Sequence, residues 1–150
     1  MKIHSKLLKA IRIIKIIIIS QLLSIIFAII GRVYINSALY YRNLLTNPII
    51  LSLSIILLVG FCIIISIIFL NRNIINIVLI SISYPLYCKM FMFSRLFMFN
   101  ANTDPNDYGI GILYMGLEIF LEPLVYAIVI VSSIVAIFVH RVNNDIKNIN

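Results

Sequence analysis

The residues that could do chemistry in this chain are few, and most are ionisable side chains close to long apolar runs. Lys89 lies four residues from the end of one such run, while Glu118 and Glu122 precede another and share one helical face. Because a charge at membrane depth is costly and needs a partner, one hypothesis pairs Lys89 with Glu122, closing an outer vestibule, although helix-dipole and headgroup contacts are the commoner use of such residues. Glu118 and Asp107 would attract cations there, and Asp104 is a further candidate of this outer face. The alternative is that the acids begin a helix and the base ends one, where they interact with helix dipoles and headgroups.

A second polar pattern follows one face of the third apolar run. Asn76, Ser83 and Tyr87 lie at i, i+7 and i+11. This stripe can line a water-filled path or form hydrogen bonds to neighbouring helices, and the second use is the commoner one in membrane bundles.

The sequence offers little to an enzyme. His4 and His140 are far along the chain from every acid except Asp145, so neither a catalytic triad nor a metal-ligand cluster is recognisable. Asp104 and Asp107 lie in a turn-forming segment, and no glycine-rich phosphate loop is present. We therefore predict a protein without catalysis, cofactor or metal.

Composition shows what kind of element must carry these residues. Of the 150 residues, 63% are hydrophobic and only 11% charged, and the mean hydropathy is +1.13. A soluble domain needs more charge than this to cover its surface, so residues 1–150 are predicted to form one multi-pass membrane domain. The net charge of +7 then indicates basic loops at an anionic membrane surface rather than direct binding of nucleic acid.

Four apolar runs predict an all-α protein with four membrane-spanning helices, at about residues 13–34, 48–70, 74–93 and 121–140. The first run is too long for a signal peptide and is preceded by a basic amphipathic segment that continues into it. Pro85 predicts a kink in the third helix, and Pro123 is expected at the first position of the fourth. The short turn at residues 71–73 predicts that the second and third helices form an antiparallel hairpin.

The distribution of basic residues predicts that both termini lie in the cytosol. Eight of the 12 lysines and arginines then lie on the inner side: Lys2, Lys6, Lys9, Arg12, Lys15, Arg72, Arg141 and Lys147. All eight tyrosines fall in the outer half, as an interfacial aromatic belt would place them.

Two features bear on packing. Residues 108–121 are apolar but interrupted by glycine, which favours a short interfacial helix in the outer loop over a re-entrant segment. Small residues recur at helical spacing in the first and fourth runs, and they serve an internal bundle or a homo-oligomer equally well. They are Ser20, Ser24 and Ala28 in the first run and Ser132 and Ala136 in the fourth.

In size, span number, charge layout and abundance of Ile and Tyr, the chain resembles two groups of small bacterial inner-membrane proteins. One is the four-span membrane subunit of the Kiwa anti-phage system, which would imply an oligomeric envelope sensor that recruits a cytosolic DNA-binding partner. The other is the immunity proteins against pore-forming colicins, which would imply interception of a toxin helix within the bilayer. Neither resemblance assigns a role to a particular residue.

The resulting expectation is an oligomeric, non-enzymatic defence protein of the bacterial inner membrane. Its outer face would sense envelope disturbance, and its basic inner residues, Lys2 to Lys15 with Arg72, Arg141 and Lys147, would hold a cytosolic protein partner. The alternatives are an immunity protein that blocks a bacteriocin and a small ion channel or transporter subunit, which requires the polar stripe to face water.

Overall fold

Four long helices make up the part of the chain that the computed structural model describes, residues 2–40, 47–70, 73–93 and 108–149. They are α1 (Lys2–Tyr40), α3 (Pro48–Phe69), α4 (Ile74–Phe93) and α5 (Tyr108–Ile149). Each contains a segment long and apolar enough to cross a membrane, and none of the described residues is in a strand. The predicted all-α, four-span class is confirmed.

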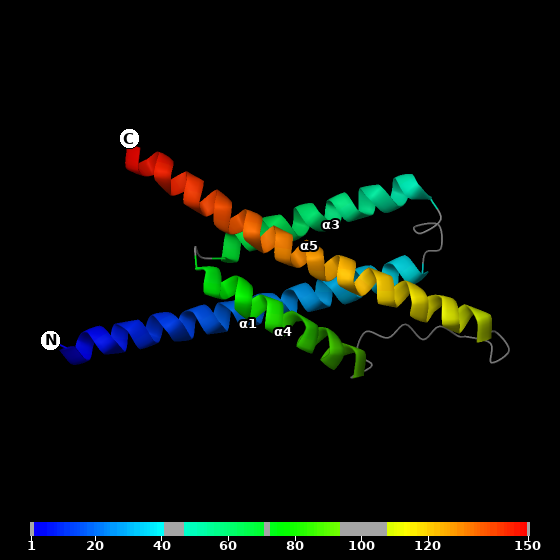
Figure 1. Ribbon diagram of the computed structural model, residues 1–150, viewed down its shortest axis with the longest axis horizontal. Coiled ribbons are helices and arrows are strands. Elements are labelled where there is room, and N and C mark those ends of the chain that lie inside the picture. The colour runs from blue at the N-terminus through cyan, green and yellow to red at the C-terminus, as the bar shows by residue number, and fades with distance from the viewer. Residues whose placement is uncertain (1, 41–46, 71–72, 94–107, 150) are drawn as a thin grey trace.

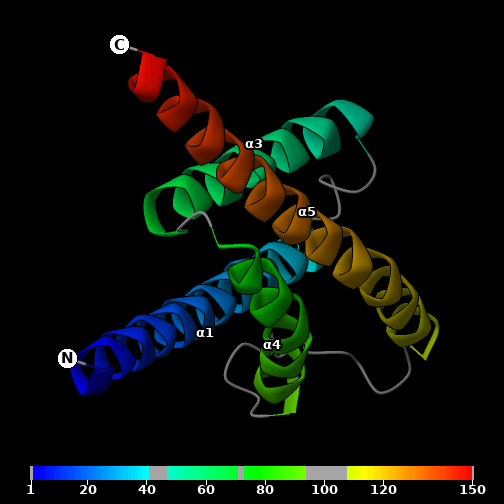
Figure 2. The same ribbon diagram turned by 60° about the vertical axis from the view of Figure 1, so that its left-hand side comes forward.

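Successive helices run in opposite directions, so both ends of the chain lie at the same end of the bundle (Figure 1). Two pairs of helices pack side by side, α1 with α4 and α3 with α5, and the pairs cross where α5 meets α1 and α4. Figure 2 shows α3 and α4 on opposite sides of this crossing.

The expected hairpin of the second and third helices is therefore wrong as a packed unit. Along the described residues, α3 and α4 have no close backbone approach, although only a short turn joins them. Leu70 ends α3 in an extended conformation, with ψ of 128°, and this turns the chain away from the helix axis. The polar face of α4 then packs on α1, while α3 buries a single row of side chains, Leu58, Cys62 and Ser66.

The core lies where α1, α4 and α5 converge. Phe27 of α1, Tyr84 of α4 and Val125 of α5 are each at most 1% exposed. The outward faces carry exposed Ile, Leu and Phe, which suits contact with lipid tails. Lipid is as apolar as these side chains, so close packing and interhelical hydrogen bonds have to hold the bundle together.

The beginning of α5 also differs from expectation. The helix begins at Tyr108 and continues through Pro123, so Pro123 does not occupy a first helical position and residues 108–121 are not a separate helix. Proline removes one backbone N–H and crowds the preceding turn, but helices in membranes tolerate it when the surrounding structure compensates. The apolar residues before Pro123 are thereby carried on the same axis as the span that follows.

Candidate functional site

The polar stripe of α4 faces α1 and is joined to it by hydrogen bonds. Ser20 Oγ donates to Asn76 Oδ1 at 2.9 Å. Gln21 links both other members of the stripe: its Nε2 donates to Ser83 Oγ at 2.9 Å, and its Oε1 accepts from Tyr87 at 2.9 Å. These contacts agree with the interhelical use of the stripe rather than with a water path. Gln21 was not singled out from the sequence, although its amide is a polar group inside the first apolar run.

A buried ion pair joins α1 to the part of α5 that precedes Pro123. Arg32 Nη1 bonds Glu118 Oε1, and the two side chains are 9% and 23% exposed. Glu118 is the only anion that Arg32 contacts among the described side chains. The Nε atom of Arg32 is buried and has no hydrogen-bond partner there. Arg32 is one of the four basic residues that the charge distribution predicts for the outer side, and its type and position did not single it out further. The rule applied to Lys89, that a charge at membrane depth needs a partner, would also have marked it.

The predicted pair of Lys89 with Glu122 does not form. Lys89 is exposed and Glu122 is half-buried, and among the described side chains the single ion pair is that of Arg32 and Glu118. The physical reason is rotation around α4. Cys88 occupies the buried side of that helix, and the next residue is turned by about 100° to the outside. The remaining outer-face candidates, Asp104 and Asp107, lie outside the described residues.

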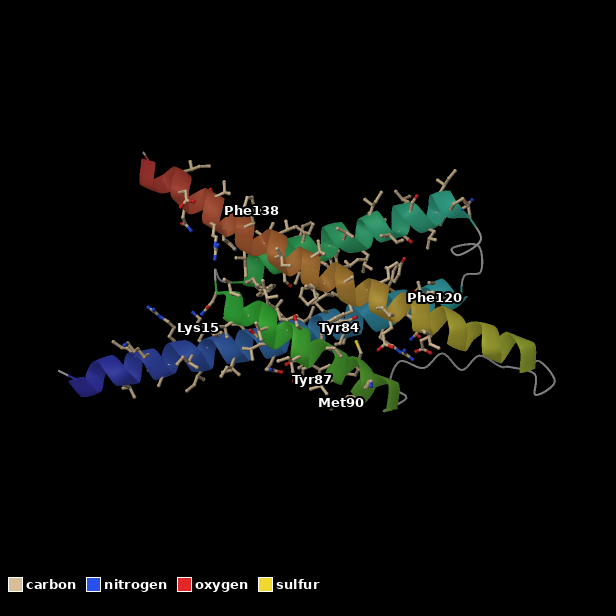
Figure 3. All side chains as sticks on the ribbon, viewed as in Figure 1. Lys15, Tyr84, Tyr87, Met90, Phe120 and Phe138 are labelled. Atoms are coloured by element: carbon tan, nitrogen blue, oxygen red, sulfur yellow. The ribbon has the colours of Figure 1, made fainter. Side chains whose placement is uncertain are left out.

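Gly31 of α1 permits a close approach of α4 and α5 to α1. A Cβ atom at Gly31 would lie 2.7 Å from Tyr84 Oη and 2.9 Å from Val125 Cγ1, shorter than any ordinary contact. Tyr84 also stacks on Tyr126 of α5, with ring centroids 5.6 Å apart and planes inclined by 27°. Three helices thus meet around one tyrosine (Figure 3).

Tyr126 has a second role, at the break that Pro85 makes in the hydrogen bonds of α4. Proline has no N–H, so the carbonyl four residues earlier, that of Ser81, loses its helical donor. Tyr126 Oη donates to this carbonyl at 3.1 Å. A side chain from α5 therefore replaces the missing backbone bond, which is how a proline is accommodated inside a membrane helix.

Near the C-terminal end of α5, a hydrogen bond joins α5 to the end of α3. His140 Nε2 donates to the carbonyl oxygen of Ile67 at 2.9 Å, one of the last carbonyls of α3, which have no partner within their own helix. The His140 carbonyl in turn accepts from Asn144 Nδ2 at 2.7 Å. The histidine is thus placed as a cap on a neighbouring helix.

The predicted small-residue stripes lie inside this single chain. All five side chains are 0% exposed: Ser20, Ser24, Ala28, Ser132 and Ala136. Ser24 Oγ returns its hydrogen bond to the Ser20 carbonyl at 2.8 Å. The stripes are therefore occupied by the internal bundle in the structure.

Two helical segments project from the end of the bundle that holds the termini. We name residues 2–19 of α1 the α1 arm and residues 141–149 of α5 the α5 arm. The described side chains of both arms are exposed over most of their length. Figure 1 shows the arms extending beyond the end of α3 and the beginning of α4. Lys15 lies at the level where α4 begins (Figure 3), so residues 2–14 of the α1 arm extend about 20 Å past that level at 1.5 Å per residue.

The predicted inner-face residues belong to these arms where the structure describes them. The exposed ones are Lys9, Arg12, Lys15 and Arg141, and Lys15 lies at the level where α4 begins (Figure 3). The side chains of Lys2, Lys6, Arg72 and Lys147 lie outside the described set. Exposed apolar residues accompany the cations, among them Leu7, Ile11 and Ile14 on α1 and Val142 and Ile146 on α5.

The described residues do not assemble a recognisable reaction centre. Within this part of the chain, no three His, Cys, Asp or Glu side chains come together to hold a metal ion. Cys62 and Cys88 are both free and buried. Comparisons of the chain with protein-family models, with curated proteins and with solved structures find no match.

Proposed function

We propose that this protein acts without catalysis, as a multi-pass membrane protein that holds a soluble protein partner on its two arms at the inner side of the membrane. The observation that carries the proposal is the projection of both arms, with cationic and apolar side chains exposed, past the level at which α3 ends and α4 begins. A helix that only crosses a bilayer needs about 20 residues. The 39 residues of α1 exceed this by far.

Charge supports the inner location of the arms. Basic residues accumulate on the cytosolic side of membrane proteins, and the arms carry most of the lysines and arginines of the chain. The ion-channel alternative loses its main support, because Asn76, Ser83 and Tyr87 bond to α1. A role in cell defence or in bacteriocin immunity rests on the resemblance alone and stays a prediction.

The experiment is site-specific photo-crosslinking in cells. A photoreactive amino acid is placed at Lys9 or Asn143 on the arms and, as a control, at Leu22 or Ile64, which face outward from the spans. We expect the two arm positions to yield the same protein adduct and the span positions to yield none. Adducts of one partner at the span positions, with none at either arm, would refute the proposal.

A further inference from the structure

We propose that the partner docks through an acidic helical segment that lies along one side of the α1 arm, the row formed by Lys9, Arg12 and Lys15. This inference rests on the proposed function and names the chemistry of the partner. It commits to a protein segment rather than to lipid headgroups, and each step follows from charge, exposure and helical register.

The first step is that the row lacks an acid within its own chain. The five acidic residues are Asp104, Asp107, Glu118, Glu122 and Asp145, so the first 103 residues contain none. Glu118 is taken by Arg32, and no described carboxylate forms an ion pair with the row. The row is therefore free, among the described residues, to pair with carboxylates of another molecule.

Two members of the row, Lys9 and Arg12, lie on the bundle side of α1. Residues 11 or 18 apart, about three or five turns, occupy the same side of an α-helix. Lys9 therefore shares its side with Ser20 and Phe27, and Arg12 shares its side with Leu23. All three of these residues are at most 1% exposed because they pack into the bundle. Lys15 lies one turn further along the helix but aligns with Ile26, which is 36% exposed, so it lies at the edge of this side.

The opposite side of the arm is apolar and continues the lipid-facing surface. By the same register, Leu7 aligns with Ile18 and Ile11 aligns with Leu22, and all four are more than half exposed. Lipids surround the bundle laterally and so meet this apolar side first. The cationic side is turned toward the region beyond the end of the bundle, between the two arms, which a soluble segment reaches from the cytosol.

The α5 arm does not offer an equivalent row. Arg141 is followed four residues later by Asp145 and then by Lys147, so its charges alternate in sign. A helical segment that carries glutamates at i, i+3 and i+6 matches the α1 row in sign and spacing, and no described carboxylate lies on the row to repel it.

The test uses the whole protein in nanodiscs of phosphatidylcholine and a synthetic helical peptide with glutamates at this spacing, followed by fluorescence anisotropy. The row variant is Lys9→Gln/Arg12→Gln, and the matched control, Arg141→Gln/Lys147→Gln, removes the same charge from the other arm. We expect the row variant to raise the dissociation constant roughly fivefold, as two exposed ion pairs imply. The control should change it less than twofold, and added salt should weaken binding throughout.

Two outcomes would overturn the inference. If both double variants weakened peptide binding equally, the peptide would be attracted by the net charge of the arms and not by the row. Retention of phosphatidylglycerol in native mass spectrometry that depends on Lys9 and Arg12, with no peptide binding, would assign the row to lipid. Crosslinks at Asn143 without any at Lys9 would separate the two proposals, because the proposed function would stand and the row would fail.

Discussion

At the scale of single residues, Gly31 is a glycine whose replacement the structure leaves no room for. An alanine methyl would overlap Tyr84 Oη and Val125 Cγ1, and Tyr84 is fixed by its stack on Tyr126. We expect Gly31→Ala to lower the free energy of unfolding by about 1–3 kcal/mol, the usual cost of overpacking. Unfolding by SDS in mixed micelles measures it.

Gly60 provides the matched control for this prediction. It also lies within a membrane helix, but nothing comes within 4 Å of the place of its Cβ atom. Gly60→Ala should be neutral or stabilise the protein by up to about 1 kcal/mol, through the better helix propensity of alanine. Equal destabilisation by the two substitutions would contradict the close approach at Gly31.

The ion pair of Arg32 and Glu118 makes a second prediction at this scale. Glu118→Ala leaves the arginine buried without its anion, and we expect a loss of about 3 kcal/mol of unfolding free energy. Replacing both partners, as Arg32→Met/Glu118→Leu, should recover most of this loss, because no unpaired charge remains. The same denaturation assay compares the variants.

Glu122→Ala is the control for the ion pair, since Glu122 is half-buried and forms no ion pair in the described structure. It should cost less than about 1 kcal/mol. If Glu122→Ala lowered the free energy of unfolding more than Glu118→Ala, Glu122 rather than Glu118 would be the acid in the ion pair, as in the Lys89–Glu122 pair considered from the sequence.

The polar stripe of α4 and the ion pair of Arg32 with Glu118 differ in how far they could be predicted from the sequence. Asn76, Ser83 and Tyr87 repeat at helical spacing within one run, so their shared face is visible in the sequence. Arg32 and Glu118 are 86 residues apart, and their meeting depends on α5 beginning before Pro123. A prediction that begins the helix at that proline removes Glu118 from the axis on which it reaches Arg32.

At the scale of elements, α5 is the helix that compensates for defects in its neighbours. It supplies Tyr126 to the Ser81 carbonyl that Pro85 leaves free and His140 to the end of α3. We expect Tyr126→Phe to cost about 1 kcal/mol, since the ring and its stack remain and only the hydrogen bond is lost.

A double-mutant cycle tests whether the proline is the cause. In Pro85→Ala the new N–H of residue 85 can bond the Ser81 carbonyl, so Tyr126→Phe should then cost less than in the parent protein. A positive coupling of about 0.5 kcal/mol or more is expected in the micelle assay. Additive losses would show that Tyr126 stabilises the bundle independently of the break at Pro85.

The pairing of elements is the part of the fold that the sequence predicted least well. A three-residue turn brings the ends of α3 and α4 together but does not decide which faces pack. Side-chain contacts decide which faces pack. Asn76 of α4 forms a hydrogen bond with Ser20 of α1, whereas the buried row of α3 (Leu58, Cys62 and Ser66) packs against α5. Hydropathy measures how well each helix suits a lipid environment, and it contains no information about which helices pack together.

At the scale of the whole molecule, the number of spans could be predicted because apolar length is a local property. The four helices of the structure cover the four predicted runs, except that α3 ends one residue early, at Phe69, and that α1 and α5 are longer at both ends. The apolar stretches of these two helices extend into both arms, over Leu7–Ala38 in α1 and Glu118–Ile146 in α5. Hydropathy therefore does not separate the arms, on which the proposed function depends, from the spans.

The last prediction concerns the sidedness of the arms, which the balance of basic residues favours as cytosolic. The two buried native cysteines, Cys62 and Cys88, are replaced by alanine, and single cysteines are introduced at Lys9, Asn143 or Asn47. Lys9 and Asn143 lie on the two arms, and Asn47 precedes α3 at the other end of the bundle (Figure 1).

In intact cells, a membrane-impermeant maleimide should label Asn47→Cys and spare Lys9→Cys and Asn143→Cys until the membrane is opened. Labelling of both arm positions from outside would place the cationic row away from every cytosolic partner, whereas labelling of one arm alone would contradict the shared end of the two termini.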